Sequence, residues 1–208
     1  MLRLIFRISG LAALLLVASA ALAQTEFSAD VVNNGGNAKQ KNSKVYFGKD
    51  KIRFEGKDAS DPRGSGAVIF DLASESWTVI ADKQHMYMVM PSSMMESRGM
   101  FSFFKSGDVE NACVEWLKQE TNKGGTCHKD GREVVNGRST VKYSGTNAKG
   151  EPSSAWFDSK LRFPVKWDGK NGGELQNIQE GPQPSSLFDM PAGYTKMDMG
   201  GMMMKQHN

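Results

Sequence analysis

The residues that could carry out chemistry are few and scattered along the chain. The three histidines, His85, His128 and His207, fall in different parts of the sequence. The sequence contains no HExxH or GxSxG motif, no phosphate-binding loop and no paired-carboxylate signature. We therefore expect a protein that is not an enzyme and uses no cofactor. The residues of a catalytic triad can be far apart in the sequence and meet only in the folded protein. If the structure placed His85 or His128 beside an acid and a nucleophile, a hydrolase would be favoured instead.

The two cysteines, Cys113 and Cys127, are close together in the sequence. In an oxidising compartment, an even pair of this kind is most simply a disulfide. The alternative is a redox or metal-binding pair, but the chain has neither a CxxC motif nor a supporting His/Cys cluster. We predict a structural disulfide, worth about 3 kcal/mol in the chain-entropy account.

The C-terminal segment is rich in soft potential ligands. Met197, Met199, Met202, Met203, Met204 and His207 all fall within it. Thioethers of this kind suit Cu(I), and chain ends are more often flexible segments without a role. We expect a flexible tail at residues 197–208 and keep weak copper binding as an alternative function.

The N-terminus has the three parts of a secretory signal peptide. Arg3 and Arg7 precede an apolar stretch at residues 8–17, and small residues end in Ala23 before Gln24. The apolar stretch is too short for a comfortable membrane span, and the residue directly after the cleavage site is Gln24 and not the cysteine to which a lipid is attached in lipoproteins. We expect residues 1–23 to be removed and the mature protein to be periplasmic or secreted.

The mature chain is nearly neutral and long enough for one domain. It would have 208 − 23 = 185 residues and, without Arg3 and Arg7, a net charge of +3 − 2 = +1. A protein with so small a net charge lacks the strongly basic surface that binds nucleic acid. We expect a single monomeric domain at residues 24–196 that binds no nucleic acid.

Alternating apolar and polar residues predict many short strands separated by turn signals, which include Asp130-Gly131 and Asn136-Gly137. Between Pro91 and Gly125 the pattern changes to a helical insert. Ser93 and Glu96 form a capping box there, and residues 108–120 have the spacing of a second short helix. The predicted fold class is mainly β (α+β), with an antiparallel sheet. The last element, Pro184 to Tyr194, is expected to close the barrel end with Leu187 and Phe188.

Large apolar residues suggest a cavity covered by the helical insert. In the strand at residues 85–90 both faces are apolar, so both need cover, and methionine adapts to varied apolar ligands. The candidate ligand-binding residues are Phe54, Phe70, Trp77, Met86, Met88, Met90, Met94, Met95, Phe101 and Phe104. The alternative is that these side chains simply fill a core, since an apolar stripe does not distinguish the two.

Several phrases resemble the LolA/LolB-like lipoprotein-carrier superfamily and, more closely, a bacterial family of unknown function related to it. They are KVYFGKDKIRFEG (44–56), ADKQHMYMVMP (81–91), GREVVNGRSTVKY (131–143), FPVKW (163–167) and ELQNIQEGPQPSSLFDMPAGYTKM (174–197).

The resemblance implies a LolA-like half-open β-barrel with a helical lid across its concave side. It also implies binding of a lipid or a lipoprotein acyl chain, as a carrier or an envelope sensor, with an envelope protein as a further partner. The other class of function is a structural or protein-interaction module whose hollow is filled by its own side chains.

Overall fold

The computed structural model describes residues 24–34, 42–57, 65–91, 98–119, 122–169 and 172–197. The predicted signal peptide, the capping box at Ser93 and Glu96, and the tail beyond Met197 lie outside the described residues. Within the described ranges, no helix has the length and apolar character needed to cross a membrane.

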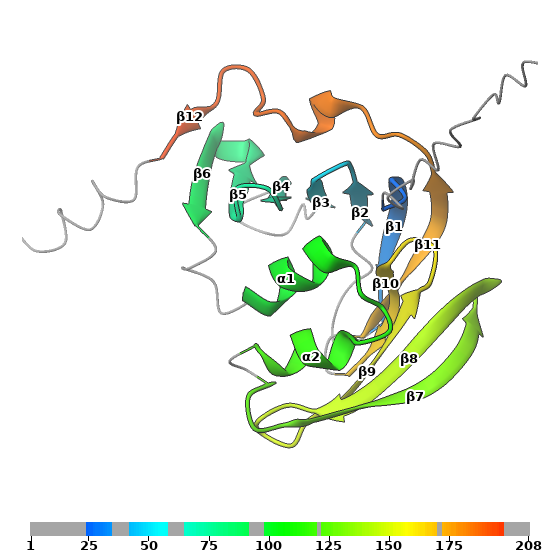
Figure 1. The fold of residues 1–208 in the computed structure, drawn as a ribbon. Helices are drawn as coiled ribbons and strands as arrows, with labels where there is room; N and C mark the ends of the chain where they lie inside the picture. Colours follow the sequence, from blue (N-terminus) through cyan, green and yellow to red (C-terminus); the bar gives the residue numbers. More distant parts are fainter. Residues whose placement is uncertain are drawn as a thin grey trace, which may run out of the picture.

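Twelve strands form one sheet that curves around two short helices (Figure 1). Neighbouring strands are antiparallel except β12 and β6, which are parallel. The strand order is β12-β6-β5-β4-β3-β2-β1-β11-β10-β9-β8-β7. The strands are β1 (Phe27–Asn33), β2 (Asn42–Phe47), β3 (Lys51–Lys57), β4 (Gly66–Asp71), β5 (Ser76–Ala81), β6 (Met86–Pro91), β7 (Thr126–Val135), β8 (Arg138–Thr146), β9 (Pro152–Asp158), β10 (Phe163–Asp168), β11 (Gly173–Glu180) and β12 (Thr195–Lys196).

The helical insert packs on the concave side of the sheet (Figure 1). It contains α1 (Arg98–Ser106) and α2 (Ala112–Leu117). Phe103 and Phe104 of α1 join the main core, where the Phe104 ring stacks on that of Phe163 at 5.0 Å between centroids. The predicted fold class is therefore confirmed, and α2 is shorter than the 108–120 helix expected from its spacing.

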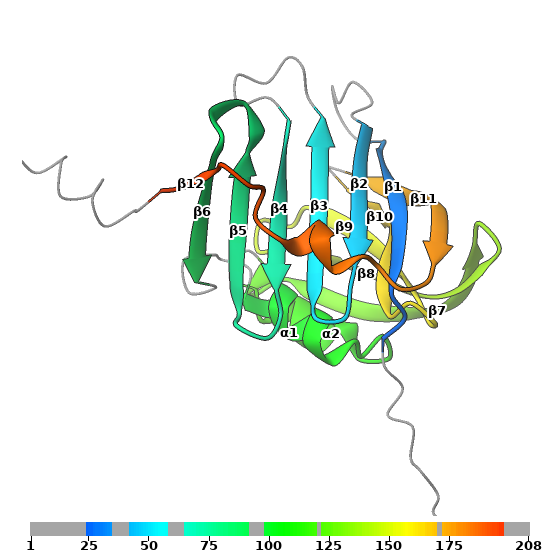
Figure 2. The same ribbon diagram turned by 90° about the horizontal axis from the view of Figure 1, so that it is seen from above.

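The C-terminal segment crosses the convex side of the same sheet (Figure 2). Its short helix η4 (Ser185–Phe188) places Phe188 against a second core cluster with Ile69 and Ile80. Gly48 makes room for this ring, because a Cβ there would lie 2.7 Å from Phe188 Cε2. Leu187 and Phe188 therefore cover the outer face of the sheet instead of closing the barrel end, since the outward-facing apolar residues of β4 and β5 need cover.

Candidate ligand-binding site

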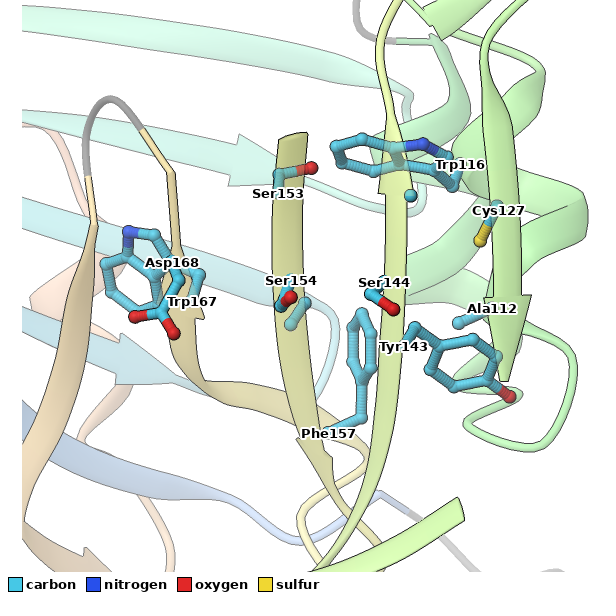
Figure 3. A pocket seen from close by; sticks show the side chains of 12 residues that line it. Ala112, Trp116, Cys127, Tyr143, Ser144, Ser153, Ser154, Phe157, Trp167 and Asp168 are labelled. Carbon is cyan, nitrogen blue, oxygen red and sulfur yellow. The ribbon is translucent and has the colours of Figure 1, made fainter. Parts of the chain in front are cut away.

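A pocket of about 270 Å³ lies between α2 and one half of the concave face (Figure 3). Its walls come from one helix and four strands, and most of its lining is apolar. Among the lining residues Asp168 is the one with a carboxyl side chain, and it is exposed. The lining residues are Ala112, Trp116, Cys127, Tyr143, Ser144, Gly145, Ser153, Ser154, Ala155, Phe157, Trp167 and Asp168.

The pocket exists because small residues lie between large aromatic ones. Ala155 of β9 is directly opposite Tyr143 of β8 on one side and Trp167 of β10 on the other. Facing positions on adjacent strands place their side chains on the same face of a sheet. The methyl group of Ala155 therefore leaves space that Tyr143 and Trp167 border without filling.

Trp167 is itself placed by a glycine on the neighbouring strand. A Cβ at Gly173 would lie 2.7 Å from Trp167 Cζ2 and 2.7 Å from the carbonyl oxygen of Val32. A side chain at position 173 would therefore displace the indole. This contact fixes the far wall of the pocket.

A disulfide joins Cys113 of α2 to Cys127 of β7, with 5.5 Å between the two Cα atoms. The predicted bond is confirmed, and bonds of this kind are typical of oxidising compartments. Opposite Cys127 lies Gly145 of β8, where a Cβ would come 2.0 Å from the carbonyl oxygen of Thr126. The lack of a side chain at Gly145 thus allows β7, which carries the disulfide, to approach β8 closely at the pocket.

The segment before α2 is anchored to the sheet by polar contacts. The Tyr143 hydroxyl donates a 2.9 Å hydrogen bond to the Val109 carbonyl oxygen, and Arg162 Nε donates a 2.7 Å bond to the Gly107 carbonyl oxygen. Glu110 pairs with both Lys129 and Arg132 of β7. The hydrogen bond from Lys129, with the charge of Arg132, lowers the pKa of Glu110. Burial raises the pKa of Tyr143, which keeps its hydroxyl a neutral donor.

Most of the predicted ligand-binding residues lie on the other half of the concave face. The rings of Phe54 and Phe70 are 6.0 Å apart, Phe70 is opposite Trp77, and Trp77 is opposite Met90. Phe70 and Met90 are buried, whereas Phe54, Trp77, Met86 and Met88 are half-buried. The structure brings this group together, outside the pocket at α2, and its role in binding stays a prediction.

The remaining predicted residues come from the helical insert. Phe104 is 5% exposed and packs in the core. Met94, Met95 and the side chain of Phe101 lie outside the described part of the chain. The prediction that these residues form a lid therefore stays a prediction.

A histidine does meet an acid and a serine. His128 Nε2 lies 2.9 Å from Ser144 Oγ and 3.1 Å from Asp130 Oδ1, and Ser144 Oγ lies 2.8 Å from Asp130 Oδ2. In a catalytic triad, the acid and the serine bind opposite nitrogens of the imidazole. Here both approach the same nitrogen, which cannot donate to the carboxylate and accept the serine proton together. The His128 side chain is also 66% exposed, so the cluster lacks the geometry of general-base catalysis.

Sequence reasoning missed nearly all of the pocket lining. Cys127 was predicted as half of the disulfide, and Ala112 and Trp116 fall within the helix predicted at residues 108–120, but none of the lining residues was predicted to bind a ligand. The one available signal was the small residues of β9, Ser153 and Ala155, which alternate on a strand otherwise able to hold larger side chains. Across the described ranges, no cluster of three or more His, Cys, Asp or Glu side chains could hold a metal ion.

No family model and no curated protein matches the sequence. Solved structures do match it. An uncharacterized conserved protein from Thermus thermophilus is 8% identical with a TM-score of 0.55, and the match covers 85% of this chain and 91% of that one. PNGF-II is 9% identical with a TM-score of 0.50, over 86% of this chain and 32% of that one.

MucB is 14% identical with a TM-score of 0.46, and the match covers 83% of this chain and 59% of that one. Another matching structure is a LolA superfamily protein from Nitrosomonas europaea. At such low identities these likenesses concern the fold alone. The mainly antiparallel sheet that curves around a helical insert is the half-open architecture expected from the resemblance.

Proposed function

We propose that this protein, which has a LolA-like half-open barrel, binds an apolar ligand at the concave face of its sheet. The ligand class is a lipid or the acyl chain of a lipoprotein. The observation that carries the proposal is the pocket of about 270 Å³ between α2 and β8, β9 and β10. If the space between α2 and the sheet were only core, larger side chains would be expected at Ala112 of α2 and Ala155 of β9.

The size of the pocket favours one chain over a whole lipid. Ligand pockets usually measure about 300 to 1,000 Å³, so this one, at about 270 Å³, is slightly smaller than that range. Each CH₂ removed from water contributes about 0.8 kcal/mol, so a partly enclosed acyl chain would still be held usefully. The half-buried row of Phe54, Val68, Val79 and Met88 provides further apolar surface on the same concave face for the rest of a longer chain.

The proposal includes export and a non-enzymatic role. A signal peptide at residues 1–23 would deliver the chain to the periplasm or beyond, which is consistent with the Cys113–Cys127 disulfide. There the protein would act as a carrier of the acyl chain or as a sensor of it. The geometry of His128, Asp130 and Ser144 argues against turnover of the ligand, for the reason given above.

Tryptophan fluorescence tests the site directly. Trp116 and Trp167 line the pocket, whereas Trp156 is packed beneath Lys142 and Lys166, with its ring centroid 5.1 Å and 4.4 Å from their Nζ atoms. Bromine on a fatty-acid chain quenches indoles at short range. Titration with a brominated fatty acid should therefore quench Trp116 and Trp167.

Three variants assign the quenching. Trp116→Phe and Trp167→Phe should each remove part of it, while the matched control Trp156→Phe should leave it intact. Saturable quenching with this pattern supports the proposal. Lack of quenching in the wild-type protein, or quenching lost in Trp156→Phe alone, would leave the protein-interaction module as the better account.

A further inference from the structure

The disulfide lies at the pocket and connects two of its walls. Cys127 lines the pocket, and Cys113 belongs to the same short helix as Ala112 and Trp116, which also line it. The bond therefore joins the helical wall of the pocket to the sheet wall. It is the one covalent link between these two walls, since the chain has no other cysteines, and the N-cap residue of α2, Asn111, makes no side-chain capping bond.

The two ends of the insert are held very differently. Before α2, the contacts of Gly107, Val109 and Glu110 fix the chain to β7, β8 and the β9–β10 turn. After α2, Asn122 Nδ2 donates to the Trp116 carbonyl oxygen at 3.1 Å, a bond made within the insert and not to the sheet. Among the described residues, the polar contacts that hold this segment to the sheet therefore lie on the N-terminal side of α2, and the disulfide adds a covalent link from the helix itself.

The bond also lies where a reductant can reach it. In the described part of the chain β7 is the last strand of the sheet, so no further strand there covers the free side of Cys127. Both cysteines are half-buried, and the neighbouring α2 residues Val114 and Leu117 are exposed. A disulfide deep in the core of a sheet would not offer this access.

We propose that the Cys113–Cys127 disulfide is a redox-controlled latch on the pocket: it closes the pocket when oxidised and releases α2 when reduced. This inference rests on the proposed function, whose site it regulates. The reductant is a dithiol, such as the paired cysteines of a thiol–disulfide oxidoreductase. One thiolate of the reductant attacks a sulfur of the Cys113–Cys127 bond, which breaks that bond and forms a mixed disulfide with one of the two cysteines. The second thiol of the reductant then attacks the mixed disulfide and releases that cysteine as a thiol. The protein gains two electrons and two protons as two thiols, and the reductant leaves as a disulfide.

The test compares oxidised protein, protein reduced with dithiothreitol, and the Cys113→Ser/Cys127→Ser double variant. Circular dichroism monitors the sheet, and hydrogen exchange monitors the amides of Ala112–Leu117 against those of β8 and β9. Brominated fatty-acid quenching monitors binding. On reduction we expect an unchanged sheet, faster exchange in α2 alone and about tenfold weaker binding, all reversed by reoxidation. The double variant should behave like reduced protein and ignore dithiothreitol.

Two results would overturn the latch. One is unchanged exchange in α2 after complete reduction, and the other is cooperative unfolding of the whole sheet, which would make the bond a structural cross-link only. Failure of the proposed function gives a different result. In that case oxidised protein does not bind the fatty acid, while the exchange measurement still reports whether reduction releases α2.

Discussion

The hydroxyl of Tyr143 on β8 donates a hydrogen bond to the carbonyl oxygen of Val109, one turn of chain before α2, at 2.9 Å. Tyr143 is 4% exposed and Val109 is 8% exposed, so the bond is shielded from water. The same aromatic ring forms part of the pocket wall. One side chain thus shapes the pocket and fixes the helix that covers it.

Replacing this hydroxyl tests that double role. In Tyr143→Phe the Val109 carbonyl oxygen loses its partner while the ring remains. We expect a loss of about 1 to 2 kcal/mol in unfolding free energy, which lowers the melting temperature by about 2 to 8 °C. Thermal unfolding followed by circular dichroism measures it. An unchanged melting temperature would mean that water replaces the bond at no cost, and that the anchor contributes nothing.

The sheet was predictable because its signals are local. Alternation in residues 43–47 and 51–55 and the turn between them indicate a hairpin, and the structure pairs Val45 with Phe54 there. The disulfide was predictable from compartment and cysteine count. Asp130-Gly131, however, was interpreted as a turn signal and is a β-bulge within β7, where the register shifts between Lys129 and Gly131. Glycine favours both features, and only the pairing with β8 distinguishes them.

The pocket was not predictable because it depends on which residues face one another across strands. Ala155, Tyr143 and Trp167 belong to different strands, and the void appears only when their register is known. The conspicuous apolar residues, such as Met88 and Phe54, lie on the same concave face as the pocket, and their role in binding stays a prediction. They belong to the half of that face formed by β3 to β6.

A charge on that half of the concave face tests whether a ligand extends across it. Met88 is half-buried, and its neighbour Val89 is on the opposite face with 39% exposure. We expect Met88→Glu to weaken fatty-acid binding by about tenfold or more, because an ionised carboxylate disfavours an apolar ligand beside it. Val89→Glu, the matched control on the same strand, should bind normally. Equal affinities in the two variants would confine the ligand to the pocket at α2.

Acid should destabilise the domain through its paired carboxylates. The pKa of Glu110 is lowered from its ordinary value of 4.5 by the hydrogen bond from Lys129, and that of Glu133 by the hydrogen bond from Trp156. A carboxyl group whose pKa is lowered in the folded protein stabilises the fold above pH 4.5. This contribution is lost as the pH falls through the lower pKa of the folded state. Urea unfolding between about pH 6 and pH 3 should show this decline.

The variant Glu110→Gln isolates one of these contributions. It cannot ionise, so its stability should decline less steeply with acid than that of the wild-type protein over the same pH range. Identical slopes for the two proteins would show that the ion pairs of Glu110 with Lys129 and Arg132 do not contribute to folding.

The central claim is that the space around Ala155 holds an acyl chain. Native mass spectrometry of the purified protein, with lipid extraction and identification of what is released, measures occupancy directly. We expect one acyl-chain ligand per protein in the wild type and in the control Ala73→Leu, which adds the same side chain at an exposed turn residue. We expect none in Ala155→Leu, whose larger side chain occupies the space between Tyr143 and Trp167 while the circular dichroism spectrum is unchanged. A ligand-free wild-type protein that stays empty after incubation with fatty acids, or equal occupancy in Ala155→Leu, would contradict the account.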